Sequence, residues 1–320
     1  MITKKMQELV SGNSLIRAMF EEGKELAAKY GKENVYDFSL GNPSVEPPKE
    51  VKQAILDIVN EEEPNYLHGY MSNAGYEDVR ATIAESLNKR FGTAFTEKNI
   101  IMTVGAAGGL NVVLKTVLEQ GDEVITFAPF FGEYKNYVEN FGGTLVAVSP
   151  DMETFMPNIE EFETKLTEKT KAVIINTPNN PTGVVYSEEI IKKLAAVLEK
   201  KQSEYGHEIY LVSDEPYREL VYGNIEVPYI TKYYANTIVG YSYSKSLSLP
   251  GERIGYLTVA NEMADFEDVV TALGIATRIL GFVNAPSLQQ RVIARCIDAK
   301  VDVSIYDKNR RLLVENLRKF

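Results

Sequence analysis

A lysine in a serine-rich segment is the first residue of this sequence that could do chemistry. Lys245 closes the run Ser242-Tyr243-Ser244-Lys245 directly after an apolar stretch, and Arg253 follows eight residues later. At the mouth of a sheet a lysine amine is partly removed from water, which lowers its pKa and suits it to Schiff-base formation. Two serine hydroxyls and an arginine could hold a phosphate dianion beside it. A surface lysine next to a serine-rich loop is the alternative, and this segment alone does not decide between the two.

A run of small residues offers a second phosphate site. Gly105, Ala106 and Ala107 follow another apolar run and open a helical segment. Small side chains let backbone N–H groups approach a phosphate at a helix N-terminus. The spacing matches neither the P-loop nor the GxGxxG pattern. A tight packing turn is therefore the alternative interpretation.

An acidic residue ends a third apolar run. Asp214 would be costly in a buried position unless a cation or hydrogen-bond donor faced it. A protonated pyridine nitrogen would be such a partner. Tyr217, three residues later, could then reach the phenolate oxygen of the same ring. An aspartate that caps the next helix is the alternative.

Asn180 and Phe131 follow two further apolar runs. Pro178, Pro181 and Gly183 restrict the loop around Asn180, so its amide can be presented rigidly. Phe131 could stack on a flat ring. A simple Asn-Pro turn and ordinary core packing are the corresponding alternatives.

The elements that must position these residues alternate between short apolar runs and helical stretches. Most of the runs are rich in Val and Ile with little polar alternation, which is typical of strands buried on both faces. The expected strands are Ile100–Val104, Glu123–Phe127, Thr144–Val148, Ala172–Asn176, Ile209–Ser213, Thr237–Tyr241 and Ile254–Val259. The helical stretches between them are Gly109–Leu118, Tyr134–Asn140, Ile159–Leu166 and Ser187–Ser203.

This alternation predicts a mostly parallel sheet covered by helices, in which only the last two strands are close enough in sequence to be antiparallel. Open α/β sheets bind ligands at the carboxyl ends of their strands. All five groups of candidate residues are expected at that edge. Their combination carries more weight than any one of them.

Composition excludes several classes of protein. The 320 residues carry a formal net charge of -11, so nucleic acid and anionic membranes are not electrostatic partners. One cysteine and two histidines make neither a disulfide nor a metal site. No apolar run approaches the ~20 residues of a membrane helix, and no signal core follows the start. The expected location is the cytoplasm.

Three motifs together resemble a known family. Residues 179–183, Asn-Asn-Pro-Thr-Gly, residues 214–217, Asp-Glu-Pro-Tyr, and residues 242–245 with Arg253 are similar to those of fold type I pyridoxal-phosphate enzymes. The closest resemblance is to the class I/II aminotransferases typified by aspartate aminotransferase, from about residue 37 onward. It implies a three-layer α/β/α large domain with a mostly parallel seven-stranded sheet, and a small second domain.

The resemblance also implies boundaries. Residues 1–43 would form an N-terminal segment of the small domain and dimer arm, residues 44–280 the large domain, and residues 281–320 the start of the small domain. Relatives continue for roughly 70–80 residues, including the arginine that pairs with the substrate α-carboxylate. A chain shortened in this way is expected to be impaired in catalysis, or to be a piece of a longer protein.

Residue roles follow from the same resemblance. Pyridoxal 5′-phosphate (PLP) would be held as the internal aldimine, a Schiff base on Lys245, whose amine later moves a proton between the substrate Cα and cofactor C4′. Asp214 would keep the pyridine nitrogen protonated, and Asn180 and Tyr217 would bond the ring O3′. Phe131 would stack on the ring. The residues expected at the phosphate are Gly105, Ala106, Ala107, Ser242, Ser244 and Arg253.

Three more residues enter through the resemblance alone. Tyr70 matches the tyrosine that the family inserts into the partner's phosphate site, which implies a homodimer with shared active sites. Gly41 matches the glycine whose backbone contacts the substrate carboxylate. Arg278 lies near a segment that supplies a partner-subunit arginine in some relatives, although a surface or dimer-contact role fits it as well.

The predicted reaction is ping-pong transfer of an amino group between an L-amino acid and a 2-oxo acid. A C–S lyase, decarboxylase or cyclase of the same fold is an open alternative, because those reactions begin at the same Schiff base. A PLP-binding chain that turns over nothing is a second alternative. A PLP-binding sensor domain of a transcription regulator is disfavoured, since only about 40 non-basic residues precede the large domain.

Overall fold

The computed structural model describes residues 2–11, 15–35 and 41–319. They belong to two compact units, Met1–Ser44 and Val45–Phe320. The first unit contains helices α1 (Lys4–Ser11) and α2 (Leu15–Tyr30). The second contains the sheet, and the residues after 280 fall in this same unit. A separate small domain from residue 281 stays a prediction.

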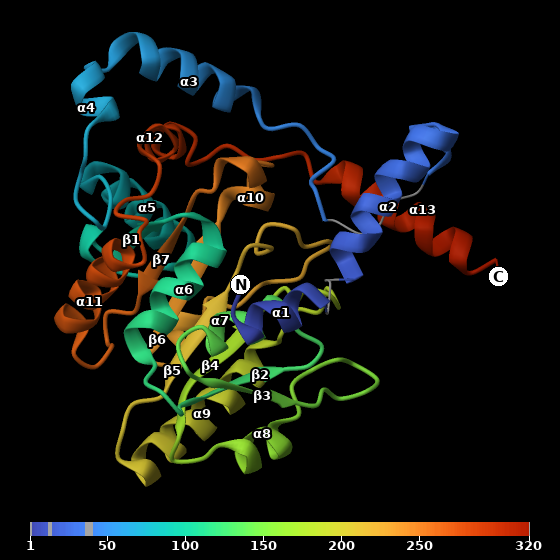
Figure 1. Cartoon of the computed structure of the whole chain (residues 1–320). Coiled ribbons are helices and arrows are strands. Elements are labelled where there is room, and N and C mark those ends of the chain that lie inside the picture. Colours follow the sequence, from blue (N-terminus) through green and yellow to red (C-terminus); the bar gives the residue numbers. More distant parts are fainter. Residues whose placement is uncertain (1, 12–14, 36–40, 320) are drawn as a thin grey trace. The chain divides into compact units, whose positions relative to one another are not determined.

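Seven strands form one sheet in the order β1-β7-β6-β5-β4-β2-β3 (Figure 1). Their bounds are β1 Ile100–Thr103, β2 Glu123–Phe127, β3 Thr144–Val148, β4 Thr170–Asn176, β5 Tyr210–Asp214, β6 Thr237–Ser242 and β7 Gly255–Val259. Neighbours from β6 to β3 are parallel, whereas β7 is antiparallel to both β6 and β1. The predicted α/β class, the seven strands and the antiparallel last pair are confirmed.

Helices cover both faces of the sheet. Alternate residues of one strand point to opposite faces, so Ile101 and Ile174 belong to one hydrophobic cluster while Ile100 and Ile175 belong to two others. The Ile101 cluster is filled by α6, α7 and α11. The opposite face is filled by α3, α5 and α12 over one half of the sheet and by α8 and α9 over the other. The core therefore has three layers.

Three of the four predicted helices, α7, α8 and α9, begin and end within two residues of their predicted positions. The bounds of the helices in this unit are α3 Lys49–Glu61, α4 Pro64–His68, α5 Glu77–Phe91, α6 Gly105–Val117, α7 Glu133–Glu139, α8 Ile159–Lys165, α9 Glu188–Tyr205, α10 Tyr243–Ser246, α11 Phe266–Ile279, α12 Ser287–Arg295 and α13 Ser304–Leu317. In the part of the chain described, none of the helices combines the length and apolarity needed to cross a bilayer.

The start of α6 is the main difference from the prediction, since the helix begins at Gly105 and not at Gly109. Glycines disfavour helix formation in general, so the helical pattern is recognisable in the sequence only from Gly109. Here they permit close packing. A Cβ at Gly109 would lie 3.1 Å from a methyl group of Leu257 on β7, and one at Gly108 would lie 3.2 Å from Val104.

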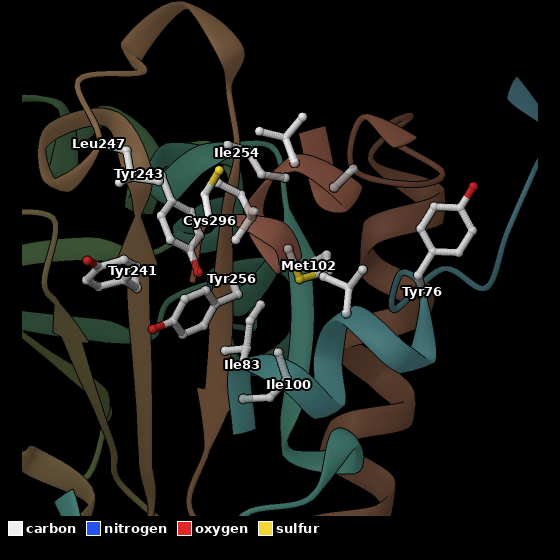
Figure 2. Packing of buried hydrophobic residues seen from close by; sticks show 14 of the residues in the cluster. Tyr76, Ile83, Ile100, Met102, Tyr241, Tyr243, Leu247, Ile254, Tyr256 and Cys296 are labelled. Atoms are coloured by element: carbon white, nitrogen blue, oxygen red, sulfur yellow. The ribbon is translucent and has the colours of Figure 1, made fainter. Parts of the chain in front are cut away.

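Helix α10 packs on the sheet through aromatic side chains. Tyr243 of α10 lies against Tyr241 of β6 and Tyr256 of β7, with ring centroids 5.3 and 5.9 Å away (Figure 2). All three tyrosines are buried, and Leu247 after the helix is buried in the same cluster. This packing holds the short turn that carries Lys245 against the end of the sheet.

Candidate active site

The candidate residues follow strands that all run in one direction. The structure places Gly105 after β1, the segment 128–131 after β2 and the loop 177–183 after β4. Asp214 and Ser242 are the last residues of β5 and β6. The two antiparallel pairings of β7 make β1 parallel to β6. The carboxyl ends of these strands therefore meet at one edge of the sheet, as the sequence predicts.

Asp214 is the buried acid of this edge, with only 6% of its surface exposed. Its Oδ2 accepts a hydrogen bond of 2.6 Å from the hydroxyl of Tyr134. Its main-chain carbonyl accepts one of 2.7 Å from the amide of Asn176. The other carboxyl oxygen, Oδ1, is buried without any hydrogen-bond partner among the described residues. The carboxyl group therefore faces a space in which a donor is still needed.

Burial is the main electrostatic influence on this carboxyl group. It raises the pKa of Asp214 to about 6, against the hydrogen bond from Tyr134, which lowers it, while nearby Glu215 raises it further. A cation at Oδ1 would lower the pKa again and stabilise the ionised form. The helix-cap alternative for Asp214 does not apply, because a turn and not a helix follows β5.

The lysine and the two serines form one tight turn. The Ser242 hydroxyl accepts a hydrogen bond of 3.1 Å from the backbone N–H of Ser244, and the two hydroxyl oxygens lie 2.7 Å apart. Lys245 is half-buried, and burial lowers the pKa of its amine. This is the direction that Schiff-base chemistry requires.

Arg253 meets the start of helix α6. A Cβ built on Gly105 would lie 3.0 Å from Nη2 of Arg253, so the guanidinium lies directly against this glycine. Gly105 has a φ of 68° and Arg253 a φ of 52°, both in the left-handed region. Ala106 and Ala107, in the first turn of α6, are half-buried. Backbone N–H groups and a guanidinium thus converge on one place, which suits an anion.

Asn180 and Tyr217 lie together on the other side of this edge. The Asn180 side chain hydrogen-bonds to Tyr217, which lowers the pKa of Tyr217, although burial and the charge of Asp214 raise it by more. Asn180 is positioned by Asn176, whose Oδ1 accepts a 2.6 Å hydrogen bond from the Asn180 backbone N–H. An amide and a phenol are therefore paired at this edge of the sheet.

Phe131 follows β2 and is 36% exposed. Its ring meets Tyr134 edge-on, with centroids 5.6 Å apart and planes at 82°. The Phe131 carbonyl also accepts the backbone N–H of Tyr134 at 3.0 Å. Part of the Phe131 side chain thus remains accessible beside the residue that contacts Asp214.

Three predicted residues are not placed with this group. Tyr70 lies in the loop after α4 and is 93% exposed. Arg278 is exposed near the end of α11, and its guanidinium makes no hydrogen bond or ion pair within the described ranges. Gly41 lies in the N-terminal unit. Their predicted contacts stay predictions.

Tyr134 and Asn176 are the contributors that sequence reasoning missed. The local pattern predicts Tyr134 only as the first residue of a helix, and Asn176 only as the last residue of a strand. Their polar atoms reach Asp214 from 80 and 38 residues away in sequence. A signal that could have pointed to such residues is that a buried carboxylate, here Asp214, needs hydrogen-bond donors around it.

A buried ion pair, also missed, anchors the turn after Asp214. Glu215 and Arg218 are 0% and 5% exposed, and Arg218 Nε lies 2.5 Å from Glu215 Oε2. Arg218 also donates to the carbonyls of Val227 and Pro228 at 2.9 and 2.8 Å. Because Tyr217 lies between the two partners in sequence, the pair restricts where its ring can point.

These features place a half-buried lysine, a buried carboxyl group and an arginine beside a helix N-terminus at one edge of an α/β sheet. Among the described residues no group of His, Cys, Asp and Glu could hold a metal ion. The chain belongs to the family described as aminotransferase class I and II, whose sequence pattern matches residues 33–320. The resemblance to fold type I PLP-dependent aminotransferases is confirmed, and PLP is the cofactor of the aspartate aminotransferase-like members.

Individual relatives agree with this assignment. A crystal structure of an aminotransferase from Eubacterium rectale is 49% identical with a TM-score of 0.96, over 99% of this chain and 80% of that one. Aspartate aminotransferase from Thermotoga maritima is 28% identical with a TM-score of 0.83, over 99% and 80%. A probable aspartate/prephenate aminotransferase of Aquifex aeolicus is 33% identical over 248 residues, which span 76% of this chain and 60% of that protein.

Proposed function

We propose that this chain moves an amino group between an L-amino acid and a 2-oxo acid in two successive half-reactions, with PLP attached to Lys245. The buried Oδ1 of Asp214, which lacks a hydrogen-bond partner in the described part of the chain, carries the proposal. A buried carboxylate oxygen is costly unless a donor is supplied, and the protonated ring nitrogen of PLP is such a donor. The names of the curated relatives support the reaction class.

The residues at the edge of the sheet fit the remaining groups of PLP. Arg253 and the first backbone N–H groups of α6 suit its phosphate, together with the hydroxyls of Ser242 and Ser244. Asn180 and Tyr217 suit the ring hydroxyl. The accessible part of the Phe131 side chain suits stacking on the ring itself.

When bound, PLP supplies an electron-withdrawing cationic ring that stabilises the charge left on the substrate Cα as its proton departs. Lys245 takes up and returns that proton, because burial lowers its pKa and leaves more of the amine neutral near pH 7. Asp214 holds the proton on the ring nitrogen. Tyr134 and Asn176 keep Asp214 oriented for this task.

The proposal includes a homodimer in which Tyr70 reaches the phosphate site of the partner. A tyrosine that is 93% exposed in one protomer can gain burial and a polar partner from a second chain. An active site completed from two protomers is the arrangement that this exposure favours. Aspartate is the first donor to try, because several relatives are named for it.

A transfer assay tests the reaction. The full chain is incubated with PLP, L-aspartate and 2-oxoglutarate, and glutamate, oxaloacetate, ammonia and CO₂ are quantified. Equal amounts of glutamate and oxaloacetate are expected. Release of ammonia or CO₂ without glutamate would instead indicate a lyase or decarboxylase. If no amino acid in a full donor screen gives a product, the transfer proposal is wrong for this chain.

Tyr134→Phe is expected to make PLP binding more sensitive to acid. The hydrogen bond from Tyr134 lowers the pKa of Asp214, so its loss raises that pKa above about 6, by about one unit for a bond to a charged group. Below its pKa the protonated Asp214 must lose a proton before it can pair with a cationic ring. The affinity of the cofactor-free chain for PLP, measured from about pH 5 to 8, should therefore fall at a higher pH in the variant. Tyr186→Phe, a change of another buried tyrosine, should follow the wild-type curve; coincident curves for Tyr134→Phe would contradict the prediction.

Tyr70→Phe is expected to weaken PLP binding about tenfold or more, because one hydrogen bond to the phosphate dianion is lost. Affinity for pyridoxal, which lacks the phosphate, should not change. The unfolding temperature of the cofactor-free chain should also stay constant, since the ring is 93% exposed. Equilibrium dialysis of both ligands provides the measurement, with Tyr66→Phe on helix α4 as the control. Unchanged PLP affinity would rule out the phosphate contact.

A further inference from the structure

The loop that carries Tyr70 is fixed to its surroundings by its backbone. We call residues 69–76 the Tyr70 loop. The carbonyl of Ala74 accepts the N–H of Met102 on β1 at 2.9 Å, and the N–H of Gly75 donates to Ser72 at 2.8 Å. The N–H of Tyr76 donates to the fully buried Gln290 of α12 at 2.9 Å. Tyr76 and Met102 lie at the start of α5 and on the neighbouring strand (Figure 2). The end of the loop that leads into α5 is therefore hydrogen-bonded to residues of the core.

The side chain of Asn284 holds the backbone of the two residues that follow Tyr70. Nδ2 of Asn284 donates hydrogen bonds to the carbonyls of Met71 at 3.0 Å and Ser72 at 2.7 Å. In the reverse direction, Nδ2 of Asn73 donates to the carbonyl of Val283 at 2.8 Å. The two segments, more than 200 residues apart in sequence, are thus joined from both sides.

The backbone beside Asn284 is strained. Val283 has a φ of 61°, and a β-branched residue seldom occupies this left-handed region. The turn is closed by Val283 N–H donating to Thr277 at 3.2 Å and by Asn284 N–H donating to Phe282 at 2.7 Å. Such strain persists only where the surroundings maintain it, and it is commonly found at functional positions. Here it directs the Asn284 amide at the Tyr70 loop.

We propose that Asn284 is a positioning residue for Tyr70, which orders the loop so that the phenol can enter the partner's phosphate site. This inference rests on the proposed function, in which Tyr70 contacts that phosphate. Because the Tyr70 ring is exposed, its direction depends on the backbone on either side of it. Ordering this backbone before the protomers associate removes an entropic cost from cofactor binding.

The chemistry of the side chain makes the proposal specific. One amide NH₂ supplies two donors, and the two carbonyls of residues 71 and 72 use both. An aspartate at the same position would have nearly the same shape but would present oxygens to two acceptors. Asn284→Ala removes the bonds, whereas Asn284→Asp replaces them with repulsion. The aspartate variant should therefore be the more severe of the two.

The test measures cofactor affinity of the cofactor-free full chain by equilibrium dialysis. Asn284→Ala is expected to weaken PLP binding about fivefold to tenfold, from the loss of two neutral hydrogen bonds, and Asn284→Asp by more. Affinity for pyridoxal should stay unchanged in both variants, because the loop acts on the phosphate alone. A purely structural loss would weaken both ligands together.

A double-mutant cycle isolates the route through Tyr70. In a Tyr70→Phe background, Asn284→Ala should have no further effect on PLP affinity. Asn88→Ala is the matched control, because this half-buried asparagine also ties a loop, through the backbone of Phe95 at 2.7 and 2.8 Å. It should lower the unfolding temperature without changing PLP affinity.

The outcomes separate the inference from the function on which it rests. If Tyr70→Phe weakens PLP binding and Asn284→Ala does not, the positioning role is wrong and the phosphate contact stands. If Asn284→Ala weakens binding equally with and without Tyr70, it acts through general stability and the inference is overturned. If Tyr70→Phe has no effect, both the phosphate contact and the inference fail.

Discussion

Replacing Lys245 by alanine is expected to abolish covalent attachment of PLP and to lower amino-group transfer by at least about 10⁴-fold. Proton transfer by a positioned side chain contributes up to about that factor, and covalent attachment is lost in addition. No neighbour replaces the amine, since Ser244 and Ser246 carry only weakly basic hydroxyls. Borohydride reduction followed by peptide mapping is the direct measurement. A phosphopyridoxyl group should appear on Lys245 in the wild type and nowhere in the variant.

Two controls accompany this experiment. Lys245→Arg keeps a positive charge at the same place, but a guanidinium does not lose its proton near pH 7, so it should be as inactive as the alanine variant. Lys165→Ala removes another half-buried lysine, which is paired with Glu161, and should leave both labelling and transfer unchanged. An adduct on any lysine other than Lys245 would end the proposed assignment.

Asp214→Asn is expected to have two effects of opposite sign. Amino-group transfer should fall roughly 10³-fold, because a neutral amide does not hold the proton on the ring nitrogen and charge stabilisation of this kind is worth about that factor. The cofactor-free chain should instead become more stable near pH 7. The buried carboxylate has an oxygen without a partner among the described residues, and the amide carries no charge to desolvate.

The pH dependence of this stability follows from the pKa of Asp214. Folding raises that pKa from 3.8 to about 6, so the folded state favours the protonated carboxyl group. The contribution of Asp214 to the stability of the folded state is therefore fully present below about pH 4, and it is lost as the pH rises through about 6. Above that range, the raised pKa lowers the free energy of unfolding by at most about 3 kcal/mol. In Asp214→Asn this loss should be missing.

Denaturant unfolding of the cofactor-free chain at about pH 5 and pH 8 measures the effect. The difference between variant and wild type should grow with pH. Asp151→Asn, at an exposed carboxylate in a surface turn, should leave transfer unchanged. Parallel stability profiles for Asp214→Asn and wild type would show that Asp214 is not the titrating group. Full transfer activity of the variant would contradict the proposed contact between Asp214 and the ring nitrogen.

Local sequence was sufficient for the strands and for the polar residues at their ends. A strand buried on both faces must be apolar throughout, so Ala172–Asn176 is recognisable without its neighbours. A polar residue such as Asp214 at the end of such a strand is costly, and its presence already indicates a partner. The same local reasoning recognises the helical pattern of α6 only from Gly109, because the glycines that permit this helix to approach β7 disfavour helices in general.

The sequence by itself therefore determined the parallel-sheet class, the lysine in its serine-rich turn and the acid at the end of a buried strand. Only the tertiary structure decided which groups hold them. Tyr134 satisfies one oxygen of Asp214 and leaves the other open, and Asn284 ties down the loop of Tyr70. The physical reason is that hydrogen bonds and burial depend on distance in space. No periodicity or spacing along the chain encodes a contact between residues 80 or 212 positions apart.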